Sequence, residues 1–209
     1  MDMAGLIAAF FTLFVVIDPI GLAPLFVALT QGESTHKRRV IAVRAVAIAA
    51  FVLVLFGIFG EAVLGFAGIS MGAFRIAGGI LLFLTALDML FERRTKRRGE
   101  QAATHDDDAS DDPSVFPLAT PLIAGPGAIA SMILLMDRAD TLLLDVAVIG
   151  VLALVLAMVL VFFLSAGLLE RLLGVTGTNV VTRLLGMLLA ALSVQFVIDG
   201  LREVGTLAS

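Results

Sequence analysis

The chain has 209 residues, of which 60% are hydrophobic and only 15% are charged, and its mean hydropathy is +1.08. Soluble domains carry about 25% charged residues, so this composition excludes a soluble globular protein and indicates an integral membrane protein. The absence of cysteine excludes disulfides, thiolate catalysis and cysteine-ligated metal sites. The formal net charge of −4 says little about partners, because acidic and basic residues lie in separate segments.

The first apolar run, from Gly5 to Leu29, is interrupted at its centre by Asp18-Pro19-Ile20-Gly21. Proline removes a backbone donor and clashes with the preceding turn, so we expect two half-helices instead of one continuous rod. A carboxylate at the centre of a bilayer costs about 2.5–3.5 kcal/mol at the low end of estimates. We therefore interpret Asp18 as a binding-site residue. Capping of the second half-helix is the alternative, and the two roles are compatible.

Six segments are long and apolar enough to cross a bilayer, which takes about 20 helical residues. The expected spans cover residues 4–30, 40–60, 70–91, 115–136, 142–169 and 177–201. We therefore predict an all-α integral membrane protein with six transmembrane helices. No basic segment precedes the first span, so we read it as retained and not as a signal peptide.

Polar residues inside the third and sixth spans are candidates for lining a site. Thr85 and Ser193 each lie ten residues after an arginine near the start of their span, Arg75 and Arg183, and we expect both near the midplane. Hydrogen bonding of these hydroxyls to the preceding helical turn is the alternative interpretation. Gln195 carries a primary amide, which needs hydrogen-bonding partners in hydrocarbon.

The segment 92–114 differs in kind from the spans, because a basic run is followed there by an acidic run. Such a composition cannot bury a core, so we expect a cytosolic tether and not a cation site. It divides the chain into a first three-helix repeat, residues 1–91, and a second, residues 115–209. Most basic residues lie in the loops after spans one, three and five, and the positive-inside rule then puts both termini outside the cytoplasm.

The two halves of the chain are related in sequence. The fourth span holds a second break, Gly125-Pro126-Gly127, whose proline aligns with Pro19 at an offset of 107 residues. Independently, Arg75-Ile76-Ala77-Gly78 aligns with Arg183-Leu184-Leu185-Gly186 at an offset of 108. Each half has three spans, so duplicated halves must cross the membrane in opposite senses. The sequence therefore predicts a 3+3 inverted-topology repeat with spans one and four broken mid-membrane, a plan common among secondary transporters.

The repeat-related arginines and glycines have structural interpretations. Arg75 and Arg183 lie near opposite membrane surfaces, so we expect them to pair with a helix C-terminus or an acid, and contact with a substrate carboxylate is the alternative. Glu61 and Glu170 are nearby acids in the sequence. Gly78, Gly79 and Gly186 are expected to permit close helix packing.

An inverted pair would bring the two breaks together near the bilayer midplane. Each break frees backbone N–H groups at the start of its second half-helix, where the dipole is positive, and frees carbonyls at the end of the first. The N–H groups suit a carboxylate, whereas carbonyls and Asp18 suit an ammonium group or a cation. Together with Thr85, Ser193 and Gln195, the candidate substrate-binding residues are Asp18, Pro19, Gly21, Leu22, Gly125, Pro126, Gly127 and Ala128.

Four motifs resemble the MarC family of bacterial and archaeal inner-membrane proteins. They are DPIGLAPLF at residues 18–26, FRIAGGI at 74–80, PLIAGPGAI at 121–129 and NVVTRLLG at 179–186. The first motif of that family commonly has Asn where this chain has Asp18. The resemblance runs from the first span to the sixth. It implies a six-span inner-membrane protein, with members that transport glycine, alanine and other small neutral amino acids.

The leading hypothesis is a secondary transporter of small neutral amino acids that works by alternating access, with no cofactor. Coupling to H⁺ or Na⁺, the direction of transport and homo-oligomer formation stay open. The alternative is a membrane scaffold that docks protein partners through the charged linker. Neither an enzyme nor a nucleic-acid-binding protein is expected, because the sequence has no nucleophile triad, metal-spaced His or Cys cluster or nucleotide loop.

Overall fold

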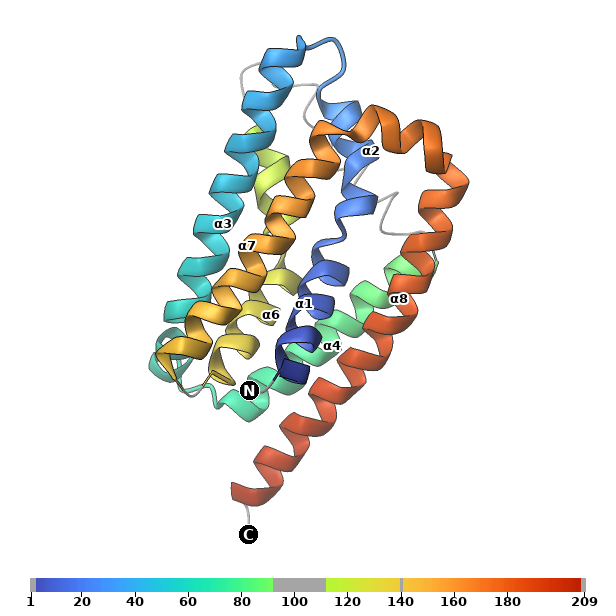
Figure 1. Cartoon of the computed structure of the whole chain (residues 1–209). Coiled ribbons are helices and arrows are strands. Elements are labelled where there is room, and N and C mark those ends of the chain that lie inside the picture. Colours follow the sequence, from blue (N-terminus) through green and yellow to red (C-terminus); the bar gives the residue numbers. More distant parts are fainter. Residues whose placement is uncertain (1–2, 92–111, 140, 208–209) are drawn as a thin grey trace.

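The computed structural model describes residues 3–91, 112–139 and 141–207 (Figure 1). This described part of the chain is helical, without β-strands. Its elements are α1 (Met3–Ile17), α2 (Pro19–Leu29), α3 (Thr35–Phe66), α4 (Met71–Leu90), η1 (Ser114–Ile123), α6 (Pro126–Asp137), α7 (Leu142–Leu164) and α8 (Ala166–Leu207).

Five helical stretches are long and apolar enough to cross a membrane, and η1 with α6 forms a sixth if the bent pair counts as one span. This confirms an all-helical membrane protein with five or six candidate spans. Several boundaries differ from the prediction. α3 is longer than the expected span, and α7 ends at Leu164 instead of residue 169. Gly174, with φ of 58°, then breaks α8, so that a short arm lies across one end of the molecule before the long part of α8 begins (Figure 1).

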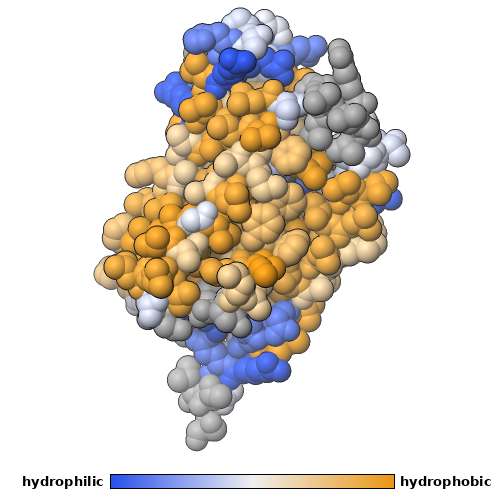
Figure 2. Space-filling model, in the orientation of Figure 1, coloured by the Kyte–Doolittle hydropathy of each residue, from blue (hydrophilic) through white to orange (hydrophobic). Residues whose placement is uncertain are grey.

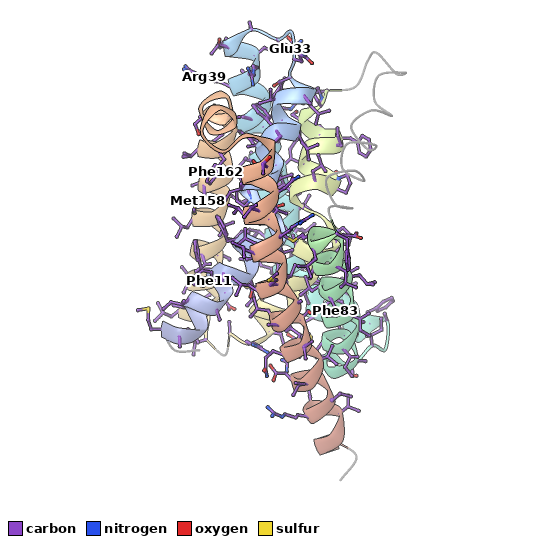
Figure 3. The ribbon with its side chains drawn as sticks, turned by 90° about the vertical axis from the view of Figure 1, so that its right-hand side faces the viewer. Phe11, Glu33, Arg39, Phe83, Met158 and Phe162 are labelled. Carbon is purple, nitrogen blue, oxygen red and sulfur yellow. The ribbon has the colours of Figure 1, made fainter. Side chains whose placement is uncertain are left out.

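α1 begins and α8 ends at the same end of the molecule, whereas the turn between α2 and α3 lies at the opposite end (Figure 1). Polar residues gather at both ends, and an apolar belt lies between them (Figure 2). Glu33 and Arg39 mark the polar end at the α2–α3 turn, and Phe11, Met158 and Phe162 lie in the belt (Figure 3). Which end faces the cytoplasm stays a prediction from the distribution of basic residues.

α4 and α8 pack closely against each other through glycines. A Cβ atom on Gly79 would lie 2.8 Å from the carbonyl oxygen of Ser193, and one on Gly186 would lie 2.9 Å from the Cβ of Met89. Gly78 instead faces Leu134 of α6, at 3.2 Å. The expectation that these glycines permit close helix packing is confirmed.

Ion pairs join helix ends where α6 meets α4 and α8. Arg75 pairs with Asp137 at the end of α6 and with Glu203 of α8, at 2.8 Å from the latter. The predicted pairing of Arg75 with an acid is confirmed. The prediction of Glu61 as the partner is wrong. The end of α6 brings Asp137 next to Arg75, although the two residues are far apart in the sequence. The Glu170 side chain lies outside the described residues.

The linker meets the helices at its last residues. Asp112 pairs with Arg44 of α3, and the Ser114 N–H donates to Asp112 Oδ1 at 3.0 Å. Arg44 therefore binds the linker's end. The rest of the predicted tether, residues 92–111, lies outside the described part of the chain.

Candidate functional site

The first break is a single left-handed residue. Asp18 has φ 60° and ψ 66°, and it is only 1% exposed. Its N–H donates to the Phe14 carbonyl at 2.9 Å, and its own carbonyl accepts from Leu22 at 3.0 Å. The Asp18 carboxylate accepts a hydrogen bond from the Gly21 N–H at 3.0 Å. The carboxylate thus caps α2, and Pro19 occupies the first position of that helix, where its missing N–H is harmless.

Gly21 is required by this cap. A Cβ atom at position 21 would lie 2.1 Å from Asp18 Oδ2, well inside van der Waals contact. The left-handed backbone of Asp18 suits Asp and Asn better than other non-glycine residues, because their short polar side chains bond to the local backbone. Both features give the Asp18-to-Gly21 motif a structural role that exists without any ligand.

The second break is more irregular. η1 is a wide, π-helical segment in which Phe116 and Thr120 have extended backbones. It meets α6 at an angle of 58°. Gly125, also extended, precedes Pro126 at the first position of α6, and no side chain caps this helix. Gly127 and Ala128 in its first turn are buried. The start of α6 therefore presents buried backbone donors without the side-chain acceptor that α2 has.

The second break lies against the end of α1. A Cβ atom on Gly127 would meet Val16 Cγ1 at 3.3 Å, Leu82 Cδ2 at 3.4 Å and Thr85 Oγ1 at 3.8 Å. Val16 lies two residues before Asp18. The structure thus brings Gly127, Thr85 and the last turn of α1 together.

The other predicted lining residues have different surroundings. Thr85 and Ser193 both donate to carbonyls of the preceding turn, to Leu81 at 2.9 Å and to Ala190 at 2.7 Å. Ser193 is fully buried at the packing surface between α4 and α8. Gln195 donates to Asp199 Oδ1 at 2.7 Å and lines a separate cavity.

The sequence analysis missed Ser131. This side chain is fully buried one turn after the second break, and its hydroxyl donates to the Gly127 carbonyl at 2.8 Å. The signal was available, since residues four apart share a helix face.

The two breaks differ in electrostatics. A helix N-terminus carries roughly half a positive charge. At the start of α2 the Asp18 carboxylate offsets this partial charge. At the start of α6 no side chain offsets it, and the charge is available to a bound anion. Among the described residues, no group of three or more His, Cys, Asp or Glu is arranged to hold a metal ion. The site can therefore offer backbone donors to an anion at α6 and a carboxylate oxygen at α2.

Known proteins are similar to this chain along nearly its whole length. Residues 3–204 match the model of the family described as MarC family integral membrane protein. A UPF0056 membrane protein of Archaeoglobus fulgidus is 40% identical and covers 97% of both chains. The UPF0056 membrane protein YvbG of Bacillus subtilis is 35% identical, over 97% of this chain and 96% of its own. The UPF0056 inner membrane protein YhgN of Escherichia coli is 34% identical, over 96% and 98%. No solved structure matches.

Proposed function

This chain belongs to the MarC family of multi-pass integral inner-membrane proteins, and from that premise we propose that it is a secondary transporter of small neutral amino acids. The substrate binds between the two helix breaks. Its carboxylate accepts from the Gly127 and Ala128 N–H groups at the start of α6. Its ammonium group lies toward Asp18.

The observation that carries this proposal is the difference between the two helix starts. α2 is capped by its own Asp18, whereas α6, which begins at the exposed Pro126 and continues with the buried Gly127 and Ala128, has no side-chain cap. A substrate carboxylate at the start of α6 would accept hydrogen bonds from the Gly127 and Ala128 N–H groups and interact favourably with the helix dipole. Val16 and Leu82 lie close to Gly127, which restricts the side chain of the substrate to a small one.

The ammonium end has acceptors of its own. Proline at 19 and at 24 removes the donors that would otherwise bond the carbonyls of Val15 and Ile20, four residues earlier. These carbonyls and the carboxylate of Asp18 form the cation-attracting side of the site. The same groups suit a coupling H⁺ or Na⁺.

Alternating access follows from the proposed inverted repeat. The two halves rock about the breaks, and the bend between η1 and α6 supplies a hinge. The distribution of basic residues supports an orientation with both termini outside the cytoplasm.

Flux of labelled glycine and alanine into proteoliposomes, with and without a proton gradient, tests the proposal. We expect uptake above that of protein-free vesicles. Asp18→Asn keeps the cap and the left-handed backbone but removes the charge. Since a hydrogen bond to a charged group contributes about 1.5–3 kcal/mol, we expect the KM to rise about tenfold or more.

Two results would count against this function. Absence of uptake across the small amino acids would contradict the substrate class. An unchanged KM in the Asp18→Asn variant would leave Asp18 with capping as its only role.

A further inference from the structure

A cavity of about 160 Å³ lies between α1, α6 and α8, apart from the helix breaks. Gly5, Ala8 and Thr12 line it from α1, Arg138 from the end of α6, and Gln195 and Phe196 from α8. The three residues of α1 follow helical spacing along one face. Figure 3 shows α8 in front, with α1 on one side of it and α4 on the other.

Two polar residues that line this cavity, Arg138 and Gln195, both contact Asp199 of α8, which does not line the cavity itself. Arg138 pairs with Asp199, and its guanidinium lies over the Phe196 ring, 5.1 Å from the ring centroid. Gln195 donates to the other oxygen of Asp199 at 2.7 Å. The Arg138 side chain is 35% exposed and that of Asp199 is 23% exposed. A partly exposed pair of this kind is weak enough to exchange partners with a ligand.

The position of the cavity relates it to the first break. Arg138 directly follows α6, so these polar residues lie at the end of the molecule where α1 begins and α8 ends. Thr12, only 2% exposed, closes the cavity on the inner side. α1 ends five residues further on, at Ile17, about 7.5 Å from Thr12 at 1.5 Å per residue, and Asp18 follows directly. The cavity therefore runs from one end of the molecule along α1 toward the break.

We propose that this cavity is an entry subsite, which binds the charged head group of a small zwitterionic amino acid before it reaches the helix breaks. Arg138 binds the carboxylate and Asp199 the ammonium group, so that the ligand's two charges replace the pair that these residues make with each other. The volume equals that of about five water molecules in the liquid, which suits glycine or alanine. This subsite rests on the proposed transport function and adds an outer binding step to it.

The chain has no cysteine, so a single engineered thiol reports on the cavity without background. In the Ala8→Cys protein, reconstituted in vesicles, we would measure the rate of modification by a charged, membrane-impermeant thiol reagent. Glycine should slow this rate several-fold, whereas acetate alone or methylamine alone should protect poorly, because each carries one of the two charges.

Variants of the arginines identify the binding group. Adding Arg138→Gln to Ala8→Cys should abolish the protection by glycine, and Arg138→Lys, which keeps the charge, should retain part of it. Arg202→Gln is the matched control. Arg202 also lies near Asp199, at 3.9 Å, but it does not line the cavity, so protection should persist.

The outcomes separate the subsite from the transport function. Glycine flux by the wild type without glycine protection at residue 8 overturns the subsite and leaves transport intact. Protection without flux supports the subsite and contradicts transport. Equal protection in the Arg138→Gln and Arg202→Gln variants, both folded by size-exclusion chromatography, overturns the role of Arg138.

Discussion

At the scale of single residues, the Asp18 carboxylate satisfies a local backbone requirement, and the proposed function gives the same carboxylate the substrate's ammonium group. A left-handed backbone costs a non-glycine residue roughly 1–2 kcal/mol, and Asp or Asn offsets that cost by bonding its neighbours. The cap to Gly21 accounts for one carboxylate oxygen. The need for a left-handed capping residue explains why either Asp or Asn suits this position, whatever the ligand.

Gly21→Ala tests whether that cap holds the break in place. The new methyl group would lie 2.1 Å from Asp18 Oδ2, so the carboxylate must move and the cap is lost. Loss of an N-cap costs about 1 kcal/mol and offsets the gain that alanine brings to a helix, so we expect a lower unfolding temperature in detergent than for a Gly→Ala variant that leaves the cap intact. Gly150→Ala is the control. Gly150 lies inside α7 with nothing near its Cβ position, so alanine should stabilise the protein by about 0.5–1 kcal/mol. Equal changes in melting temperature for the Gly21→Ala and Gly150→Ala variants would contradict the cap.

At the scale of helices, what could be predicted depended on how local the cause was. The interruption at Asp18 followed from Pro19, because a missing donor acts within one turn. The close packing of Gly79 and Gly186 was also predictable from small residues in apolar spans. The partners of Arg75, by contrast, depend on where α6 ends in space. The cavity at Gln195 depends on three helices at once, so no local pattern could reveal it.

The contact between α3 and the start of η1 predicts a pH dependence. Partial burial alone would raise the pKa of Asp112, but the hydrogen bond from the Ser114 N–H and the charges of Arg44 and Lys37 outweigh it, and the pKa lies below its ordinary value. A lowered native pKa stabilises the fold above the unfolded pKa of about 3.9, and that stabilisation disappears as the pH falls below this value.

Asp112→Asn should therefore lower the melting temperature at about pH 7 and have progressively less effect as the pH falls below about 4. Melting in detergent across this range measures the difference between the two proteins. In an Arg44→Gln background the effect of Asp112→Asn should be smaller, because the ion pair is already gone. A difference in melting temperature between Asp112→Asn and the wild type that stays constant with pH would contradict an electrostatic cause of the stabilisation.

At the scale of the whole molecule, the proposed site and the charged linker make opposite predictions about function. The two breaks belong to the helical part of the chain, between α1 and α2 and between η1 and α6. The linker is joined to α3 at its end, through the ion pair of Asp112 with Arg44. Transport then depends on the helices, whereas a scaffold that docks partners through the linker depends on the charges between residues 99 and 111.

Replacing residues 99–111 with a Gly/Ser sequence of equal length keeps Asp112 and the connection between the halves while removing those charges. Because the linker contributes no residue to the proposed site, we expect glycine flux within about twofold of the wild type, a difference of roughly 0.4 kcal/mol in transition-state terms. The matched comparison is Asp18→Asn, which leaves the linker intact and should impair flux. Loss of function in the linker variant with full function in Asp18→Asn would reverse the assignment, because only a docking role makes those charges indispensable.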